Sequence, residues 1–162
     1  MAKNILKTRN RKSSNPKKNN TIPLEEVRWK LARLWLILGG FFVLLLVAQS
    51  VMGKYQGKVQ NVWSWALPAL IPTLSLIVTV LGASAFEFHE DVILLKKTFY
   101  RVVVWLSIAY LSFLIATLLV EPFTPYESIE LLNLSNFWLA PFQGIVASAI
   151  GVLFFSTKAK QP

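Results

Sequence analysis

Four stretches of this chain contain no aspartate, glutamate, lysine or arginine, and they constrain the fold more than any other feature. They cover about residues 34–52, 62–86, 102–120 and 138–155. A helix needs roughly 17–25 apolar residues to cross a bilayer, and each stretch has that length. Backbone polar groups in lipid must be satisfied within the segment, and no stretch alternates as a membrane β-strand does. The sequence therefore predicts an all-α integral membrane protein with four transmembrane helices.

Composition agrees with a chain that meets lipid. Charged residues make up only 15% of it, against about 25% in an ordinary soluble domain. Ten of the seventeen lysines and arginines precede residue 34, so the rest of the chain is poorer still in charge. The absence of cysteine excludes a disulfide scaffold, thiolate catalysis and cysteine-bound zinc.

The positive charges predict how the helices are oriented. Lysine and arginine near span ends are retained in the cytoplasm. Fifteen of the seventeen basic residues lie before residue 34, in the 87–101 loop or after residue 155, whereas the 53–61 and 121–137 loops hold only Lys54 and Lys58. We therefore expect both termini in the cytoplasm and a multi-pass protein of the plasma membrane, most simply the inner membrane of a bacterium.

Residues 1–20 are predicted to form a disordered polybasic arm, because they are rich in charge, asparagine and serine and have too little apolar surface to pack a core. The expected partner is anionic lipid or a cytoplasmic protein. Nucleic acid is not expected, because no aromatic side chain interleaves the basic run. We favour the simpler interpretation, which is a tail that only sets topology. The basic residues of the arm are Lys3, Lys7, Arg9, Arg11, Lys12, Lys17 and Lys18.

Residues 21–33 are predicted to form an amphipathic juxtamembrane helix with Pro23 in its first turn. Leu24, Val27 and Leu31 recur at helical spacing on one face. Such a helix either lies flat in the headgroup layer or extends the first span. The membrane domain proper is assigned to residues 34–162.

The two longer loops carry different expectations. The 87–101 loop has neither glycine nor proline, so spans two and three are expected to continue beyond the membrane as helices. Its cluster of Glu87, His89, Glu90 and Asp91 is interpreted as a solvated cap and not as a metal site. The 121–137 loop is apolar after two prolines, which favours a short helix lying on the outer interface.

Small residues form one stripe on each of two spans. In lipid, small and weakly polar faces are where helix backbones approach closely. We therefore expect both stripes to pack against other helices or to line a pore, and the aliphatic stripe of span two (Leu67, Leu70, Leu74, Ile77 and Leu81) to face lipid. Pro72 is expected to free a carbonyl and favour a kink. The small-residue stripes are Pro68, Pro72, Ser75, Thr79 and Gly82 in span two, and Ala140, Gly144, Ala147 and Gly151 in span four.

Three polar side chains fall inside the predicted spans. Gln49 and Gln143 are both placed in the outer leaflet by the predicted topology, and a contact between their amides is expected because an amide in hydrocarbon needs a partner. Tyr110, in the middle of span three, needs an acceptor for its hydroxyl. These groups are interpreted first as structural.

The spans lack the ionisable residues that membrane enzymes and ion-coupled transporters use, and the chain carries no nucleotide-binding, hydrolase or metalloprotease motif. No cofactor and no metal are expected. Two functions follow. The first is a non-enzymatic membrane subunit or scaffold that acts through helix contacts and its basic arm, with a protein or a second copy as partner. The alternative is a self-assembling channel lined by span two or span four.

Overall fold

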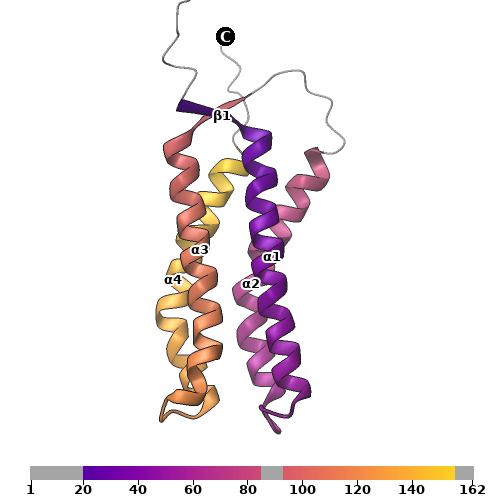
Figure 1. The fold of residues 1–162 in the computed structure, drawn as a ribbon, viewed down its shortest axis with the longest axis vertical. Helices are drawn as coiled ribbons and strands as arrows, with labels where there is room; N and C mark the ends of the chain where they lie inside the picture. The colour runs from indigo at the N-terminus through magenta and orange to yellow at the C-terminus, as the bar shows by residue number, and fades with distance from the viewer. Residues whose placement is uncertain (1–19, 85–92, 156–162) are drawn as a thin grey trace, which may run out of the picture.

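The computed structural model describes residues 20–84 and 93–155 and contains four long helices (Figure 1). All four are long and apolar enough to cross a membrane, which confirms that the four predicted spans are helices of sufficient length and apolarity. Two three-residue strands and one turn of 3-10 helix complete the described chain. In chain order the elements are β1 (Thr21–Pro23), α1 (Leu24–Val51), α2 (Val59–Ser84), β2 (Leu94–Lys96), α3 (Lys97–Val120), η2 (Glu121–Phe123) and α4 (Ser128–Phe155).

The helices run side by side along the long axis of the molecule (Figure 1). α1 and α4 each pack against both α2 and α3, and they also contact each other more sparsely. The two strands lie at one end of the bundle, which we call the sheet end. The α1–α2 and α3–α4 connections lie at the other, which we call the loop end.

The first helix is longer than its predicted span. α1 runs without interruption from Leu24 to Val51, so residues 24–33 continue the first span and do not form a separate helix lying flat. Pro23 precedes the helix instead of standing in its first turn, because its ψ of 133° is extended. The Leu24 backbone N–H donates to the carbonyl of Ile93 at 2.9 Å, which ties the start of α1 to the chain before β2.

A two-stranded antiparallel sheet at the sheet end was not predicted. Thr21 pairs with Lys96, and Pro23 pairs with Leu94. The prediction that span three continues as a helix is therefore wrong before Lys97, because β1 offers this segment backbone hydrogen bonds. Residues 87–91, with the acidic cluster and His89, lie outside the described residues.

The predicted short interfacial helix in the 121–137 loop is also wrong. α4 starts at Ser128 and continues to Phe155, so residues 128–137 belong to the same helix as span four. Pro122 and Pro125 confine the break in the chain to the residues before Ser128, and no glycine or proline follows until Pro141.

The chain reverses between α1 and α2 through two glycines. Gly53 and Gly57 have φ of 75° and 72°, in the left-handed region that glycine adopts at no steric cost. These two glycines allow residues 52–58 to form a short connection between the antiparallel helices α1 and α2.

Large side chains fill the interior of the bundle. Trp35, Phe42 and Leu46 of α1 are fully buried, as are Tyr110, Leu111 and Leu114 of α3 and Ile77 of α2. Trp35 stacks on Tyr110 with ring centroids 6.1 Å apart, and Phe42 lies 6.2 Å from Trp65. A single chain therefore has a packed core along its axis.

Candidate functional site

A proline in α2 leaves one backbone carbonyl of that helix without its helical donor. Pro72 has no N–H, so the carbonyl of Pro68, four residues earlier, loses its helical donor. Gln143 of α4 supplies a replacement, because its Nε2 donates to the Pro68 carbonyl at 2.7 Å and to the Ala69 carbonyl at 3.3 Å. A side chain of α4 thus satisfies a backbone carbonyl of α2.

The other two helices meet at the same point. The Tyr110 hydroxyl of α3 donates to the Ala69 carbonyl at 2.8 Å, which is the acceptor that the sequence required. Trp35 of α1 stacks on the Tyr110 ring. We call the place where these contacts meet the proline junction. Hydrogen bonds there join α2 to α3 and α4, and α1 contributes an aromatic contact. Its residues are Trp35, Pro68, Ala69, Tyr110 and Gln143.

The predicted contact between Gln49 and Gln143 is wrong. Gln49 Oε1 instead accepts a hydrogen bond from the Tyr55 hydroxyl, while Gln143 bonds to the carbonyls of α2. Each amide does have a hydrogen-bond partner, as expected for an amide in lipid. The partner within reach of Gln143 is the freed carbonyl of Pro68, and the partner within reach of Gln49 is the hydroxyl of Tyr55. Burial raises the pKa of Tyr55 to about 12, so its hydroxyl keeps the proton that it donates.

Three further polar atoms are buried near this level of the core. Trp35 Nε1, Thr73 Oγ1 and Ser107 Oγ have no hydrogen-bond partner within the described part of the chain. Thr73 lies one turn from Ala69 on α2, and Ser107 lies about one turn from Tyr110 on α3. These three uncharged atoms thus lie near the proline junction, whereas the buried Ser135 lies toward the loop end, where its hydroxyl accepts from Trp65.

The small-residue stripe of α2 lies mostly on the surface of the chain. All five of its members are exposed, whereas Leu70 and Ile77 of the aliphatic stripe are buried and Leu74 and Leu81 are partly buried. The prediction that the aliphatic stripe faces lipid is therefore wrong, apart from Leu67, which is exposed. Bulky aliphatic side chains fill the space between helices at their observed spacing, and the small residues remain outside.

The stripe of α4 is arranged in the same way. Ala140 and Gly144 are exposed, and Ala147 and Gly151 are partly exposed. A Cβ placed on Gly144 would meet no atom of the described chain within 4 Å. The neighbouring Val146 is the buried residue, with 1% of its surface exposed. Ala140 and Gly144 are therefore open to contacts from outside the chain.

Ion pairs join the two connections at the loop end. Lys54 Nζ lies 2.6 Å from Glu121 Oε2, and Lys58 Nζ lies 3.0 Å from Glu127 Oε2. These pairs link the α1–α2 connection to the α3–α4 connection. Both lysines expected on the outer side are thus neutralised by carboxylates.

The sheet end carries basic residues in a different setting. Arg28 donates to the carbonyl of Phe154 at 2.6 Å, near the end of α4, and its guanidinium lies 5.9 Å from the Phe154 ring centroid. A cation at a helix C-terminus complements the partial negative charge there. Lys30 pairs with Glu26, as the four-residue spacing favours. The seven basic residues of the arm lie outside the described residues.

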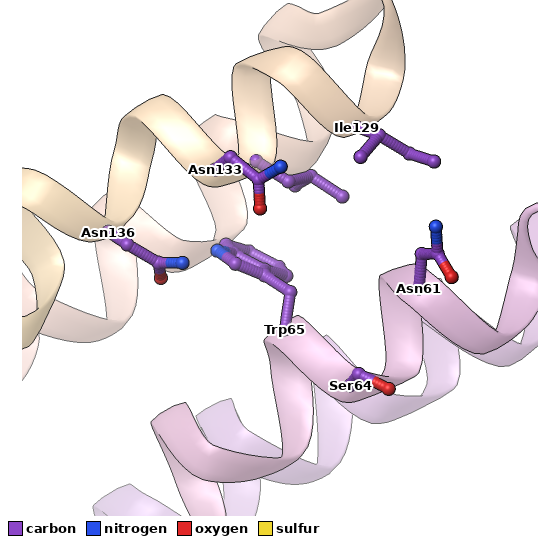
Figure 2. Close-up of a pocket in the computed structure, with 7 residues that line it drawn as sticks. Asn61, Ser64, Trp65, Ile129, Asn133 and Asn136 are labelled. Carbon is purple, nitrogen blue, oxygen red and sulfur yellow. The ribbon is translucent and has the colours of Figure 1, made fainter.

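A pocket of about 270 Å³ opens between α2 and α4 at the loop end (Figure 2). The pocket was not predicted from the sequence. Its signal there is the helical spacing of three between Asn61 and Ser64 and between Asn133 and Asn136. The lining residues are Asn61, Ser64, Trp65, Ile129, Leu132, Asn133 and Asn136.

No group of three or more histidine, aspartate or glutamate residues that could hold a metal ion occurs within residues 20–84 and 93–155. Neither a protein-family model, nor a curated protein, nor a solved structure matches this chain. The geometry of the chain itself therefore carries the functional interpretation.

Proposed function

We propose that this chain is a non-enzymatic subunit or scaffold of the plasma membrane, and that its partner packs on the small residues of α2 and α4. We call this surface the small-residue face. It consists of Pro68, Pro72, Ser75, Thr79 and Gly82 of α2 and Ala140, Gly144, Ala147 and Gly151 of α4. The observation that carries the proposal is that these residues are exposed or partly exposed, although they lie on two neighbouring helices.

A surface that meets only lipid needs no small residues. On α1 and α3 the exposed small residues, such as Gly40, stand among large exposed side chains, such as Leu44 and Trp105. Glycine, alanine and serine let another helix approach closely, and packing is a main source of helix association in lipid. The small-residue face is therefore the surface best suited to hold a second transmembrane helix.

The core supports a structural rather than a chemical role. The buried polar residues of the described chain are Thr73, Ser107 and Ser135, none of which ionises in the physiological range. A proton relay or an ion-coupled site in the membrane is typically built from ionisable residues. Hydrogen bonds between uncharged groups, such as those of Gln143 and Tyr110, stabilise contacts between helices instead.

The proposed orientation places both termini and the sheet end in the cytoplasm. The distribution of lysine and arginine supports it, since the two loop-end connections hold only Lys54 and Lys58 of the seventeen basic residues. The arm of residues 1–20 then lies beside the cytoplasmic leaflet, where each cation is worth about 1 kcal/mol of attraction to anionic lipid.

Labelling of single cysteines tests this orientation in a chain that has none of its own. We expect an impermeant thiol reagent added to intact cells to label Gln60→Cys and Tyr126→Cys, which lie at the exposed loop end. Ser13→Cys and Thr157→Cys should react only after the membrane is opened. Labelling of Ser13→Cys in intact cells would reverse the proposed topology.

Substitution of single glycines tests the small-residue face. Gly144→Leu is expected to weaken association with a partner or a second copy at least fivefold, because the added side chain would hold the partner helix away. Gly40→Leu on α1 is the matched control, since Gly40 is also exposed with no atom within 4 Å of its Cβ in the described chain. The measurement is the dissociation constant from energy transfer between labelled proteins in vesicles.

Equal effects of the two substitutions would exclude the small-residue face as the interface.

A pore is the alternative function. Because Trp35, Phe42 and Tyr110 fill the core of one chain, such a pore would require several copies lined by this face. Single-channel steps from the purified protein, lost in Thr79→Leu, would favour the pore over the scaffold.

A further inference from the structure

We propose that the pocket between α2 and α4 at the loop end binds an uncharged sugar ring, either the headgroup of a glycolipid or a free sugar. This site is separate from the small-residue face and does not depend on the function proposed for it. The inference rests on the kind of groups that line the pocket, on their lack of partners and on the rigidity of its floor.

Three carboxamides surround the pocket. Asn61 comes from the first turn of α2, while Asn133 and Asn136 lie one turn apart on α4. Figure 2 shows the three side chains around the indole of Trp65, which lies between the two helices. All three asparagines are exposed, and within the described chain their amides make no hydrogen bond. Their donors and acceptors are therefore available to a ligand.

A carboxamide donates through its nitrogen and accepts through its oxygen. Neighbouring hydroxyls of a sugar also donate and accept, so three amides match a ring that carries several of them. None of the residues that line the pocket is ionisable. A phosphate or a carboxylate would find no cation there, and an ammonium group would find no carboxylate. The lining therefore favours a neutral ligand with many hydroxyls.

The floor of the pocket is held in place from below. Trp65 Nε1 donates to Ser135 Oγ at 3.0 Å, and Ser135 Oγ donates in turn to the Leu132 carbonyl at 2.6 Å. Phe42 of α1 packs on Trp65 from inside the bundle. Trp65 is only 7% exposed, so the indole presents a small, fixed apolar contact to the C–H groups of a sugar ring. The asparagines supply most of the binding surface, and a preorganised floor reduces the entropy lost on binding.

Size and position also fit. A volume of about 270 Å³ lies just below the 300–1,000 Å³ of typical small-molecule sites, which suits one ring better than a longer ligand. The pocket lies within the first turns of two transmembrane helices. Phe137 and Trp138 are exposed beside it on α4, where aromatic side chains anchor a protein at the membrane interface. A lipid headgroup at that depth can reach the pocket from the bilayer.

The test uses the full chain purified in mixed micelles that contain equal amounts of a monoglucosyl diacylglycerol, a phosphatidylglycerol and a phosphatidylethanolamine with the same acyl chains. Native mass spectrometry measures which lipid stays bound. We expect the glucolipid to be retained preferentially, and the double variant Asn61→Leu/Asn133→Leu to lower its occupancy about tenfold, because two hydrogen bonds are lost. These side chains are exposed and unbonded, so the variant should keep the fold.

Gln60→Leu is the matched control, because Gln60 carries an exposed carboxamide on the same helix but does not line the pocket. It should leave glucolipid occupancy unchanged. Methyl β-glucoside added in excess distinguishes the sources: displacement of the lipid indicates a site for the sugar itself, and no displacement indicates the lipid-linked headgroup. Equal retention of the three lipids, preference for a phospholipid, or an equal loss in Gln60→Leu would overturn the proposal.

Discussion

Replacing Trp35 by alanine is expected to lower the free energy of unfolding by about 3 kcal/mol, the largest effect of any single substitution proposed for this chain. Trp35 is 0% exposed and stacks on Tyr110. Removal of a buried tryptophan costs about 3–5 kcal/mol in soluble cores. The lower end applies here, because lipid rather than water solvates the separated helix and mainly packing contacts are lost.

Trp105→Ala is the matched control for this experiment. Trp105 lies on α3 and is 70% exposed, so its removal should change the free energy of unfolding by less than about 1 kcal/mol. Unfolding by a denaturing detergent in mixed micelles measures both variants. If Trp105→Ala proved as costly as Trp35→Ala, the surface of α3 would have to be buried in an assembly, and the partner surface would need to include α3.

The main features of the fold could be predicted because they depend on local composition. Length and lack of charge identified all four helices, since the cost of a charge in lipid applies residue by residue. The need of Tyr110 for an acceptor followed from the same local reasoning and is met by the Ala69 carbonyl. Which group would supply that acceptor depended on the packing of α3 against the rest of the bundle.

The features that could not be predicted depend on contacts between residues that are distant in the sequence. The β1–β2 pairing joins Thr21 to Lys96, and neither strand shows the alternation that would have indicated it. The expected orientation of α2 failed for a related reason. A rule that small residues face other helices does not say whether the other helix belongs to the same chain, and here Ile77 and Leu70 fill the interior.

The proline junction combines both cases. Pro72 predicted a freed carbonyl from the sequence alone, and that carbonyl belongs to Pro68. The group that satisfies it is the side chain of Gln143, 75 residues away along the chain. The sequence had instead predicted a contact between Gln143 and Gln49. A local signal thus located the unsatisfied group, while the identity of its donor required the arrangement of α2 against α4.

This pairing leads to the second large effect, which a double-mutant cycle isolates. Gln143→Leu is expected to lower the free energy of unfolding by about 1.5 kcal/mol, near the upper end for hydrogen bonds between membrane helices, because the Pro68 carbonyl is left without a donor away from water. In the Pro72→Ala background, residue 72 regains an N–H that reaches this carbonyl along the helix. The same Gln143→Leu substitution should then cost only about 0.5 kcal/mol, with the remaining loss due to its weaker contact at Ala69.

Gln49→Leu combined with Pro72→Ala provides the control cycle, because Gln49 bonds to Tyr55 and not to α2. Its effects should add within about 0.5 kcal/mol, as for independent sites. The coupling between Gln143 and Pro72 is a difference between two measured costs, so it does not depend on how each substitution alone alters the unfolded state. A Gln143→Leu cost that is the same in both backgrounds would show that Gln143 stabilises the bundle through packing alone. Gln143 would then not stabilise the proline junction by donating a hydrogen bond to the carbonyl that Pro72 frees.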